Sequence, residues 1–402
     1  MGQARDGARY RDVFAVPEFR VLWLAQLLSV AGDQLARVAL TVLVYDRTRS
    51  ALLAALTYAV TIIPVFAGGV LLAGVGDRFP RRAVLIGCDI ARGVLVLAMA
   101  VPGMPLAVLV VLLFAVTSFN APFTAARAAI YPDILSGDDY VLGTAITMTT
   151  FQVAQVTGFA AGGAMVGFLG ARTCLLADAA TFGVSALLVR SGVQARPGRL
   201  TGSRKLFAPF TDAAAGVRLV FGEPSLRIPM LFGWLAAFTV IPEGLAAPLA
   251  QWLHGGDVTV GLVLGATALG ISVGSALFGR LVSPPRRTAL MGPLAVGSCL
   301  LLLAMGLRPV TVLTLLVLFA SGLCTCFQMQ ANAAFVSAAP AGQRSQAFGL
   351  AQAGIYLGQG LAVVVAGAAA TRYEPPLVIA VSGALGAAVA LVLAVRFHQV
   401  SR

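Results

Sequence analysis

The stretch FRVLWLAQLLSVAGDQLARVALTVLVY, residues 19–45, is long and apolar enough to cross a lipid bilayer, yet it carries two charges near its middle. About 20 predominantly apolar residues cross the hydrocarbon core as a helix. Asp33 and Arg37 are four residues apart, so they share one face of that helix and can form an ion pair. A charge at the bilayer centre costs about 2.5–3.5 kcal/mol and usually faces a bundle interior or a water-filled cavity. The stretch therefore predicts a membrane helix whose polar face lines a cleft.

The rest of the chain has the composition of a membrane protein. Of its 402 residues, 59% are hydrophobic and only 11% are charged, whereas a soluble domain carries about 25% charged residues. Further apolar segments follow the first one, at 51–75, 83–101, 105–130, 140–168, 171–190, 226–252, 258–281, 288–306, 309–335, 346–371 and 376–396. We expect an all-α integral membrane protein with twelve transmembrane helices in two pseudo-symmetric six-helix halves.

The basic residues indicate the orientation of these helices. The chain has 28 Lys and Arg against 16 Asp and Glu, and its net charge is +12. With both termini placed in the cytoplasm, the outer side receives only five of the basic residues, namely Arg47, Arg49, Arg172, Arg308 and Arg372. Cytoplasmic loops are normally the ones rich in Lys and Arg. The positive charge therefore reflects topology, and nucleic-acid binding is not expected.

Five consecutive parts follow from this pattern. They are a cytoplasmic segment 1–18, an N-terminal six-helix bundle 19–190, a polar cytoplasmic linker 191–225 with an amphipathic helix, a C-terminal six-helix bundle 226–396 and a cytoplasmic tail 397–402. The two bundles repeat with an offset near 205, which places Arg81 and Arg82 in register with Arg286 and Arg287. Two repeated halves joined by a long linker are typical of a transporter with a central cleft.

The sequence contains no sign of an enzyme, a metal site or a cofactor. Its five cysteines lie within apolar runs, with no CxxC spacing and no histidine nearby. It contains no GxxxxGK[ST] loop, so ATP-driven transport is excluded.

Four motifs carry a family resemblance. AGVGDRFPRR, residues 73–82, resembles the signature loop GxLADRxGRR of the major facilitator superfamily, although Ala73 and Pro80 replace its two glycines. NAPFTAARAAIYPDIL (120–135) and LLADAATF (175–182) resemble segments of the drug:proton antiporter branch that includes macrolide-efflux and enterobactin-exporter-type proteins. QVTGFAAGG (155–163) is similar to the antiporter signature GPxxGG, with Phe159 in place of the proline.

The resemblance implies a cytoplasmic latch that pairs with neighbouring helix ends and holds the two halves together. Its residues would be Asp77, Arg78, Arg81 and Arg82, with Arg127 as a gate or latch residue and Asp133 as the carboxylate partner of Arg78 or Arg81. A basic cytoplasmic loop with only a topological role is the alternative.

The intramembrane charges have two interpretations. Asp33 and Arg37 are either a structural ion pair or a proton-coupling pair, in which Arg37 competes with the proton for Asp33. Asp178 and Glu243 are further candidates for proton coupling, and Glu243 also for substrate binding. Asp89 and Arg92 are three residues apart, and we expect them to pair inside the first bundle.

The substrate cleft is expected to combine polar and apolar side chains. Its candidates are Gln26, Phe119, Phe151, Gln152, Gln155, Trp234, Gln328, Asn332, Gln352, Tyr356 and Gln359. Each of them is equally consistent with a contact between helices. A large cleft with few charges suits bulky amphipathic compounds better than small anions.

The sequence thus predicts a monomeric secondary exporter of lipophilic small molecules, driven by proton antiport in a bacterial inner membrane. It would work by alternating access. Its expected partners are protons, the substrate and membrane lipids. A siderophore or lysophospholipid transporter of the same fold is one alternative, and a non-transporting membrane scaffold or sensor is another.

Overall fold

The computed structural model describes residues 9–64, 79–196, 217–340 and 343–400. These residues form helices and connecting turns, and none of them lies in a β-strand. The chain divides into two compact units, and the first boundary between them, after residue 39, falls inside one long helix. Unit 1 comprises residues 1–39 and 64–204, and unit 2 comprises residues 40–63 and 205–402.

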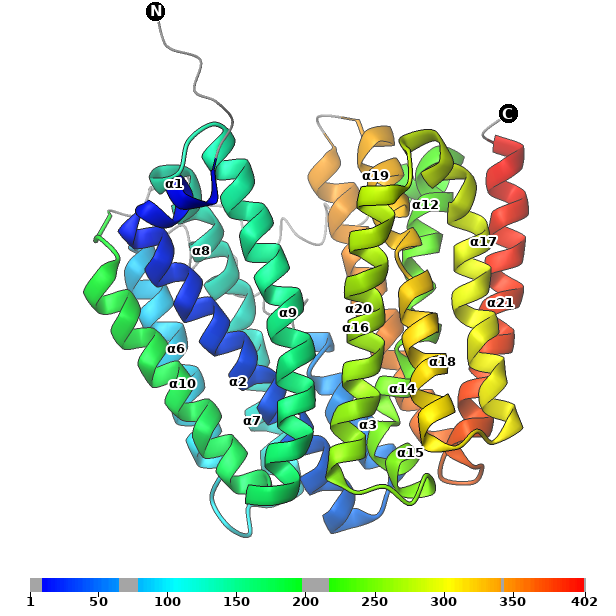
Figure 1. The fold of residues 1–402 in the computed structure, drawn as a ribbon, viewed down its shortest axis with the longest axis horizontal. Helices are drawn as coiled ribbons and strands as arrows, with labels where there is room; N and C mark the ends of the chain where they lie inside the picture. The colour runs from blue at the N-terminus through cyan, green and yellow to red at the C-terminus, as the bar shows by residue number, and fades with distance from the viewer. Residues whose placement is uncertain (1–8, 65–78, 197–216, 341–342, 401–402) are drawn as a thin grey trace, which may run out of the picture. The chain divides into compact units, whose positions relative to one another are not determined.

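Unit 1 is built from long helices that run side by side (Figure 1). In chain order they are α1 (Tyr10–Ala15), the first part of α2 (Pro17–Thr48), α6 (Arg81–Met99), α7 (Leu106–Ser118), α8 (Asn120–Ile134), α9 (Asp138–Leu169) and α10 (Ala171–Gly192). Helix α6 packs against α7, α8 and α10, and α9 packs against α10. The core cluster of this unit includes Phe19, Leu85, Phe123, Ile130 and Val189.

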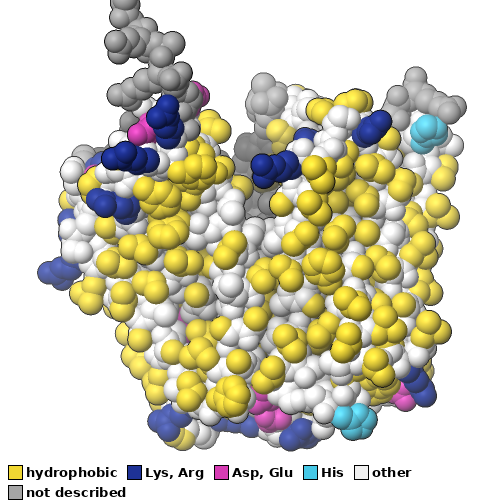
Figure 2. Space-filling view, in the orientation of Figure 1, with side chains coloured by type: hydrophobic (Ala, Val, Ile, Leu, Met, Phe, Trp, Pro, Cys, Tyr) yellow, Lys and Arg dark blue, Asp and Glu magenta, His cyan; other side chains and the backbone are white. Residues whose placement is uncertain are grey.

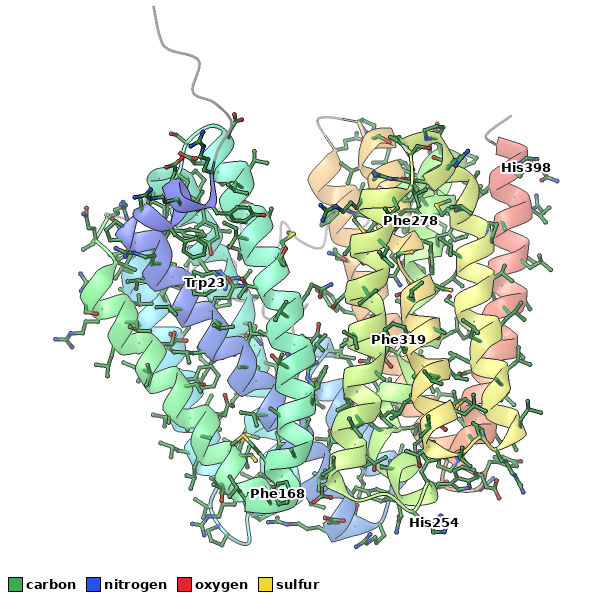
Figure 3. All side chains as sticks on the ribbon, viewed as in Figure 1. Trp23, Phe168, His254, Phe278, Phe319 and His398 are labelled. Carbon is green, nitrogen blue, oxygen red and sulfur yellow. The ribbon has the colours of Figure 1, made fainter. Side chains whose placement is uncertain are left out.

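Helices α2 and α9 lie close together because small residues line their contact. A Cβ added at Gly158 would lie 2.9 Å from Gln34 Cβ, and one at Gly162 would lie 3.1 Å from Val38 Cγ2. Trp23 on α2, labelled in Figure 3, donates its indole N–H to Thr150 Oγ1 on α9 at 2.7 Å. The glycines of the segment 155–163 therefore serve close helix packing, as small residues do between membrane helices.

Unit 2 contains the C-terminal helices and the hairpin 40–63. Its helices are the last part of α2, α3 (Ala51–Val60), α12 (Pro224–Trp234), α13 (Ala236–Thr239), α14 (Ile241–Gly244), α15 (Ala246–Trp252), α16 (Asp257–Leu281), α17 (Pro284–Leu303), the 3-10 helix η1 (Ala304–Leu307), α18 (Thr311–Cys324), α19 (Phe327–Ala338), α20 (Arg344–Ala369) and α21 (Pro375–Val400). The main packing pairs are α17 with α21, α16 with α18, and α3 with α20.

Local sequence signals explain where several helices begin. Ser50 caps α3, because its hydroxyl accepts a hydrogen bond from the Leu53 N–H at 3.3 Å. Helices α12, α17 and α21 begin at Pro224, Pro284 and Pro375, and proline is favoured in the first helical turn because its missing N–H is not needed there.

Within the described residues, ten helical segments are long and apolar enough to cross a membrane. Two other predicted spans are not among these ten segments. Residues 83–101 correspond to α6, which carries several charges, and the span 51–75 is described only as far as residue 64. The all-α membrane fold is confirmed, while the count of twelve spans stays a prediction. On each unit, hydrophobic side chains cover the middle of the visible surface and Lys or Arg gather toward the ends (Figure 2).

Candidate functional site

The most highly charged part of the interior of unit 1 centres on Arg92 of α6. This side chain is only 1% exposed, and its Nη2 donates to both carboxylate oxygens of Asp33 at 2.7 Å. Its Nη1 donates to Ser29 Oγ at 3.3 Å, and its guanidinium lies over the ring of Phe182, 4.2 Å from the centroid. Buried arginine is stable only with such compensation. Ser29 and Asp33 are one helical turn apart on α2, so one face of α2 receives the cation.

This ion pair corrects two sequence predictions. Asp33 pairs with Arg92 on α6 rather than with Arg37 on its own helix. The guanidinium of Arg37 lies over the ring of Phe159, 5.9 Å from the centroid. The predicted pair of Asp89 and Arg92 is wrong too, because Arg92 forms its salt bridge with Asp33 and Asp89 accepts a hydrogen bond from Ser185. The reason is the same in both cases: the packing of α2 on α6 brings together a carboxylate and a guanidinium from two different helices.

Asp89 has a different environment from Asp33. It is fully buried, and its Oδ2 accepts a hydrogen bond from Ser185 Oγ of α10 at 2.6 Å. Its other oxygen, Oδ1, is buried without a hydrogen-bond partner. Arg92 and Arg127 lie close enough for their positive charges to act on this carboxylate.

Asp178 of α10 is the third buried carboxylate of the cluster. It is 1% exposed, and its Oδ2 has no hydrogen-bond partner. The hydroxyl of Thr181 donates to the backbone carbonyl of Asp178 at 2.7 Å, and the carboxylate Oδ1 is 3.4 Å away from the same hydroxyl. A Cβ added at Gly32 would overlap Asp178 Oδ1 and Thr181 Oγ1. Only glycine at that position lets α2 lie against the carboxyl group of Asp178.

We call Asp33, Asp89, Arg92, Arg127 and Asp178 the charge cluster. Its members come from α2, α6, α8 and α10, and each of those helices is held by its own apolar core contacts. The Arg127 guanidinium lies over Phe123, 5.8 Å from the ring centroid. Three carboxylates and two guanidiniums in a medium of low dielectric constant interact strongly, so adding one proton alters the preferred pairing of the others. Among the described residues no group of acids, histidines and cysteines could hold a metal ion.

The basic residues at the start of α6 bind neighbouring helix ends within unit 1. Arg81 Nη1 lies 2.5 Å from Asp133 Oδ2 and 2.5 Å from the carbonyl oxygen of Ala129, both in α8. Arg82 donates to the backbone carbonyl of Arg190 in α10. The expected contact between Arg81 and Asp133 is thus present. Asp77 and Arg78 lie outside the described residues, and the role of these residues as a latch between the halves stays a prediction.

Glu243 lies in unit 2, on the short helix α14. Its carboxylate accepts a hydrogen bond from the hydroxyl of Tyr58 on α3, which is almost completely buried. Nearby, the hydroxyl of Tyr45 donates to Gln251 Oε1 on α15. These contacts attach the hairpin 40–63 to the second half of the chain.

The predicted cleft residues have mixed environments. In unit 1, Gln26 is buried and donates to the carbonyl oxygen of Thr147 at 3.5 Å, which is a contact between α2 and α9. Phe119, Gln152 and Gln155 are partly exposed, and Phe151 is exposed. In unit 2, Trp234 donates its indole N–H to the carbonyl oxygen of Ala351 at 3.1 Å. The remaining members are partly or fully exposed: Gln328, Asn332, Gln352, Tyr356 and Gln359.

The sequence analysis missed several partners. Ser185 lies seven residues after Asp178, so helical periodicity places both side chains on one face of α10. This spacing could have indicated Ser185 as a site residue. No sequence spacing could indicate Tyr58, because its hydroxyl donates to Glu243, which lies on a helix far along the chain.

Long apolar helices around buried charges define a multi-pass membrane transporter. The sequence profile of the Major Facilitator Superfamily matches residues 22–247 and 243–401. The chain belongs to this family, which is a family of transporters and not of enzymes.

Named relatives lie within the same family. The chain is 27% identical to the enterobactin exporter EntS of Citrobacter koseri over 302 residues, which cover 74% of this chain and 71% of that protein. It is 26% identical to the multidrug efflux pump Tap of Mycobacterium tuberculosis (strain ATCC 25618 / H37Rv) over 290 residues, or 68% of each chain.

Solved transporters share the fold. A POT family transporter in complex with a thioalcohol-conjugated peptide matches with a TM-score of 0.77 at 11% identity, over 97% of this chain and 100% of that one. The nucleoside transporter NupG matches with a TM-score of 0.76 at 14% identity, over 95% of this chain and 99% of that one. At these identities the likeness shows the fold alone.

Proposed function

We propose that the protein is a proton-coupled exporter of hydrophobic or amphipathic small molecules in a bacterial inner membrane. It would exchange substrate for inward-moving protons by alternating access. The observation that carries this proposal is the ion pair between Asp33 and Arg92 in the middle of unit 1.

Asp33 has the properties that proton coupling requires. Its side chain is 25% exposed, so protons can reach it, while its partner Arg92 is 1% exposed. Protonation of Asp33 removes the negative charge that compensates the buried cation, which is costly in the membrane interior. Proton binding is thereby linked to the packing of α2 against α6. Such a link between protonation and helix packing is what an antiporter needs in order to couple its two states.

The substrate class rests on two supports. A named relative is a multidrug efflux pump. The partly exposed polar residues of α20, namely Gln352, Tyr356 and Gln359, are uncharged and occur along an otherwise apolar helix. Neutral polar groups among apolar ones suit amphipathic compounds.

The test is a measurement of internal pH in proteoliposomes after addition of lipophilic drugs. We expect drug-dependent proton movement in the wild type and its loss in Asp33→Asn. Asp46→Asn is a matched control, because Asp46 lies on the same helix but is exposed and paired only with Arg49, at 3.5 Å. Drug movement without proton movement, unchanged in Asp33→Asn, would contradict proton antiport and make Asp33 and Arg92 a structural pair.

A siderophore exporter is the second candidate function. It is favoured by the relative named an enterobactin exporter. The same proteoliposomes distinguish the two candidates: a catecholate siderophore would then drive proton movement in the wild type, while lipophilic drugs would not.

A further inference from the structure

The proposed function uses Asp33 but leaves Asp178 without a role. We propose that Asp178 holds a proton in the arrangement seen here, and that Arg92 exchanges between Asp33 and Asp178 as this proton passes to Asp33. The inference rests on the proposed function for its place in transport. The protonation of Asp178 itself is a property of the resting protein and is tested without transport.

The surroundings of Asp178 favour a neutral carboxylic acid. Its side chain is 1% exposed, its Oδ2 has no hydrogen-bond partner, and the nearby Arg92 forms its salt bridge with Asp33. The hydroxyl of Thr181 has a single proton, and the backbone carbonyl of Asp178 accepts it at 2.7 Å. The carboxyl group is therefore left without a good donor. An ionised carboxylate without donors or a cation is very unfavourable in a buried site, whereas the protonated acid is tolerated.

A count of charges in the cluster leads to the same assignment. Asp33 has Arg92 as its partner, and Asp89 accepts from Ser185 while the charges of Arg92 and Arg127 act on it. Two carboxylates thus balance two guanidiniums. If Asp178 were ionised as well, the charge cluster would hold three carboxylates and two guanidiniums; Arg37, whose guanidinium lies over the ring of Phe159, is not a member of the cluster. With a proton on Asp178, the cluster is neutral.

Arg92 is placed to serve both carboxylates. Its guanidinium lies over the ring of Phe182, 4.2 Å from the centroid, and Phe182 is one helical turn after Asp178 on α10. The charges of Asp33 and Arg92 act on Asp178 at this separation. On α2, Asp33 directly follows Gly32, against which the carboxyl group of Asp178 packs. In the proposed exchange, a change of rotamer of the long arginine side chain moves its guanidinium from Asp33 to Asp178.

The exchange conserves charge at every stage. The O–H bond of Asp178 breaks, its carboxylate accepts the guanidinium of Arg92, and an O–H bond forms on Asp33. One proton thus moves from the buried acid to the one that is 25% exposed, from which it can leave. The other titratable groups near this exchange are Arg37 on α2, Asp89 on α6, and Arg127 and Tyr131 on α8.

The experiment is infrared spectroscopy of the purified protein at neutral pH, in lipid nanodiscs without substrate or a proton gradient. Labelling aspartate with ¹³C at the side-chain carboxyl distinguishes its C=O stretch from that of glutamate. We expect the wild type to show the stretch of one protonated aspartic acid and Asp178→Asn to lose it. Asp33→Asn should lose it as well, because Arg92 then pairs with Asp178 and displaces its proton. Asp46→Asn, at the exposed end of α2, should keep it.

Other outcomes overturn the inference. A wild type without the signal, or a signal that survives in Asp178→Asn, shows that Asp178 is not the protonated group. A signal lost in Asp89→Asn but kept in Asp178→Asn assigns the proton to Asp89. A signal kept in Asp33→Asn excludes the exchange of Arg92. If the signals behave as expected while drugs move no protons, the proton-antiport function fails and the protonation of Asp178 stands.

Asp178→Asn also provides a test of folding. Asparagine has the shape of the protonated acid, so this variant should keep the wild-type thermal unfolding midpoint in detergent. Asp33→Asn should also unfold near the wild-type temperature, because Asp178 then ionises and replaces Asp33 as the partner of Arg92. A large loss of stability in Asp178→Asn alone would show that Asp178 is an ionised structural residue.

Discussion

The interiors of the two units differ more than their repeated sequences suggest. In unit 1, the buried residues include Asp89, Arg92 and Asp178. In unit 2, the buried polar residues within the described part of the chain are uncharged, as with Ser298, Thr314 and Ser321, and they bond to backbone carbonyls. Among the described residues, the fully buried carboxylate and guanidinium side chains thus lie in unit 1, whereas Glu243 of unit 2 is half-buried and accepts a hydrogen bond from Tyr58.

The largest expected effect comes from removing the cation of unit 1. Arg92→Met leaves Asp33 and Asp89 without their main counter-charge, and loss of one partner of a buried ion pair costs about 3–5 kcal/mol. We expect a loss of that order in the free energy of unfolding in mild detergent, measured by denaturant titration. Drug-dependent proton movement in proteoliposomes should be abolished.

Two further variants complete this test. Arg190→Gln is the control, because this arginine is exposed at the end of α10 and its backbone carbonyl, not its side chain, accepts the hydrogen bond from Arg82. The double variant Asp33→Asn/Arg92→Met removes both charges and should regain much of the stability without regaining proton movement. An Arg92→Met protein as stable as the wild type would mean that the charges of unit 1 are not mutually dependent.

A smaller effect is expected in the packing of unit 2. A Cβ added at Gly270 of α16 would overlap the carbonyl oxygen of Phe319 in α18 and lie 2.9 Å from the Leu323 nitrogen (Figure 3 labels Phe319). Gly270→Ala should therefore cost about 1–3 kcal/mol of unfolding free energy, because backbone atoms cannot move aside cheaply. The ratio of protons to drug transported should not change.

Gly279 provides the matched control for this substitution. It lies on the same helix, and a Cβ added there meets nothing within 4 Å. Gly279→Ala should stabilise the protein by about 0.5–1 kcal/mol through the higher helix propensity of alanine. A changed proton-to-drug ratio in Gly270→Ala would show that unit 2 takes part in coupling and would remove the contrast between the units.

The smallest effect concerns the hairpin 40–63. Tyr58→Phe removes the hydroxyl that donates to Glu243. A buried hydrogen bond contributes about 0.5–1.5 kcal/mol, so the thermal unfolding midpoint in detergent should fall slightly. Tyr373→Phe, at an exposed position of unit 2, should have no effect. If Tyr58→Phe abolished proton movement with little change in stability, Glu243 would belong to the coupling machinery and unit 2 would not be a passive scaffold.

Several features were predictable from short stretches of sequence. Apolar runs predicted the membrane helices, since the length of such a run follows from bilayer thickness. The motif at 73–82 predicted the family, and the profile match confirms it. The contact of Arg81 with Asp133 was also predictable, because both belong to motifs whose helix ends meet in that family.

The pairing of the buried charges was not predictable in this way. Helical spacing predicted one ion pair between Asp33 and Arg37 and another between Asp89 and Arg92. The structure instead pairs Asp33 with Arg92. A spacing of three or four residues shows which side chains can meet on one helix, but it is silent about a neighbouring helix that presents a better partner. The contact of Tyr58 with Glu243 is of the same kind, because the two residues come from different helices.

The sequence by itself determined that this protein is an all-helical membrane transporter and which residues bring charge into the membrane. These properties depend on composition and on local periodicity, which every stretch of about 20 residues carries on its own. Only the tertiary structure decided that Arg92 joins Asp33, that Asp89 accepts a hydrogen bond from Ser185, and that Asp178 lies against Gly32 with its Oδ2 lacking a donor. In a low-dielectric interior each charge takes the best partner within reach, and reach is set by how the helices pack.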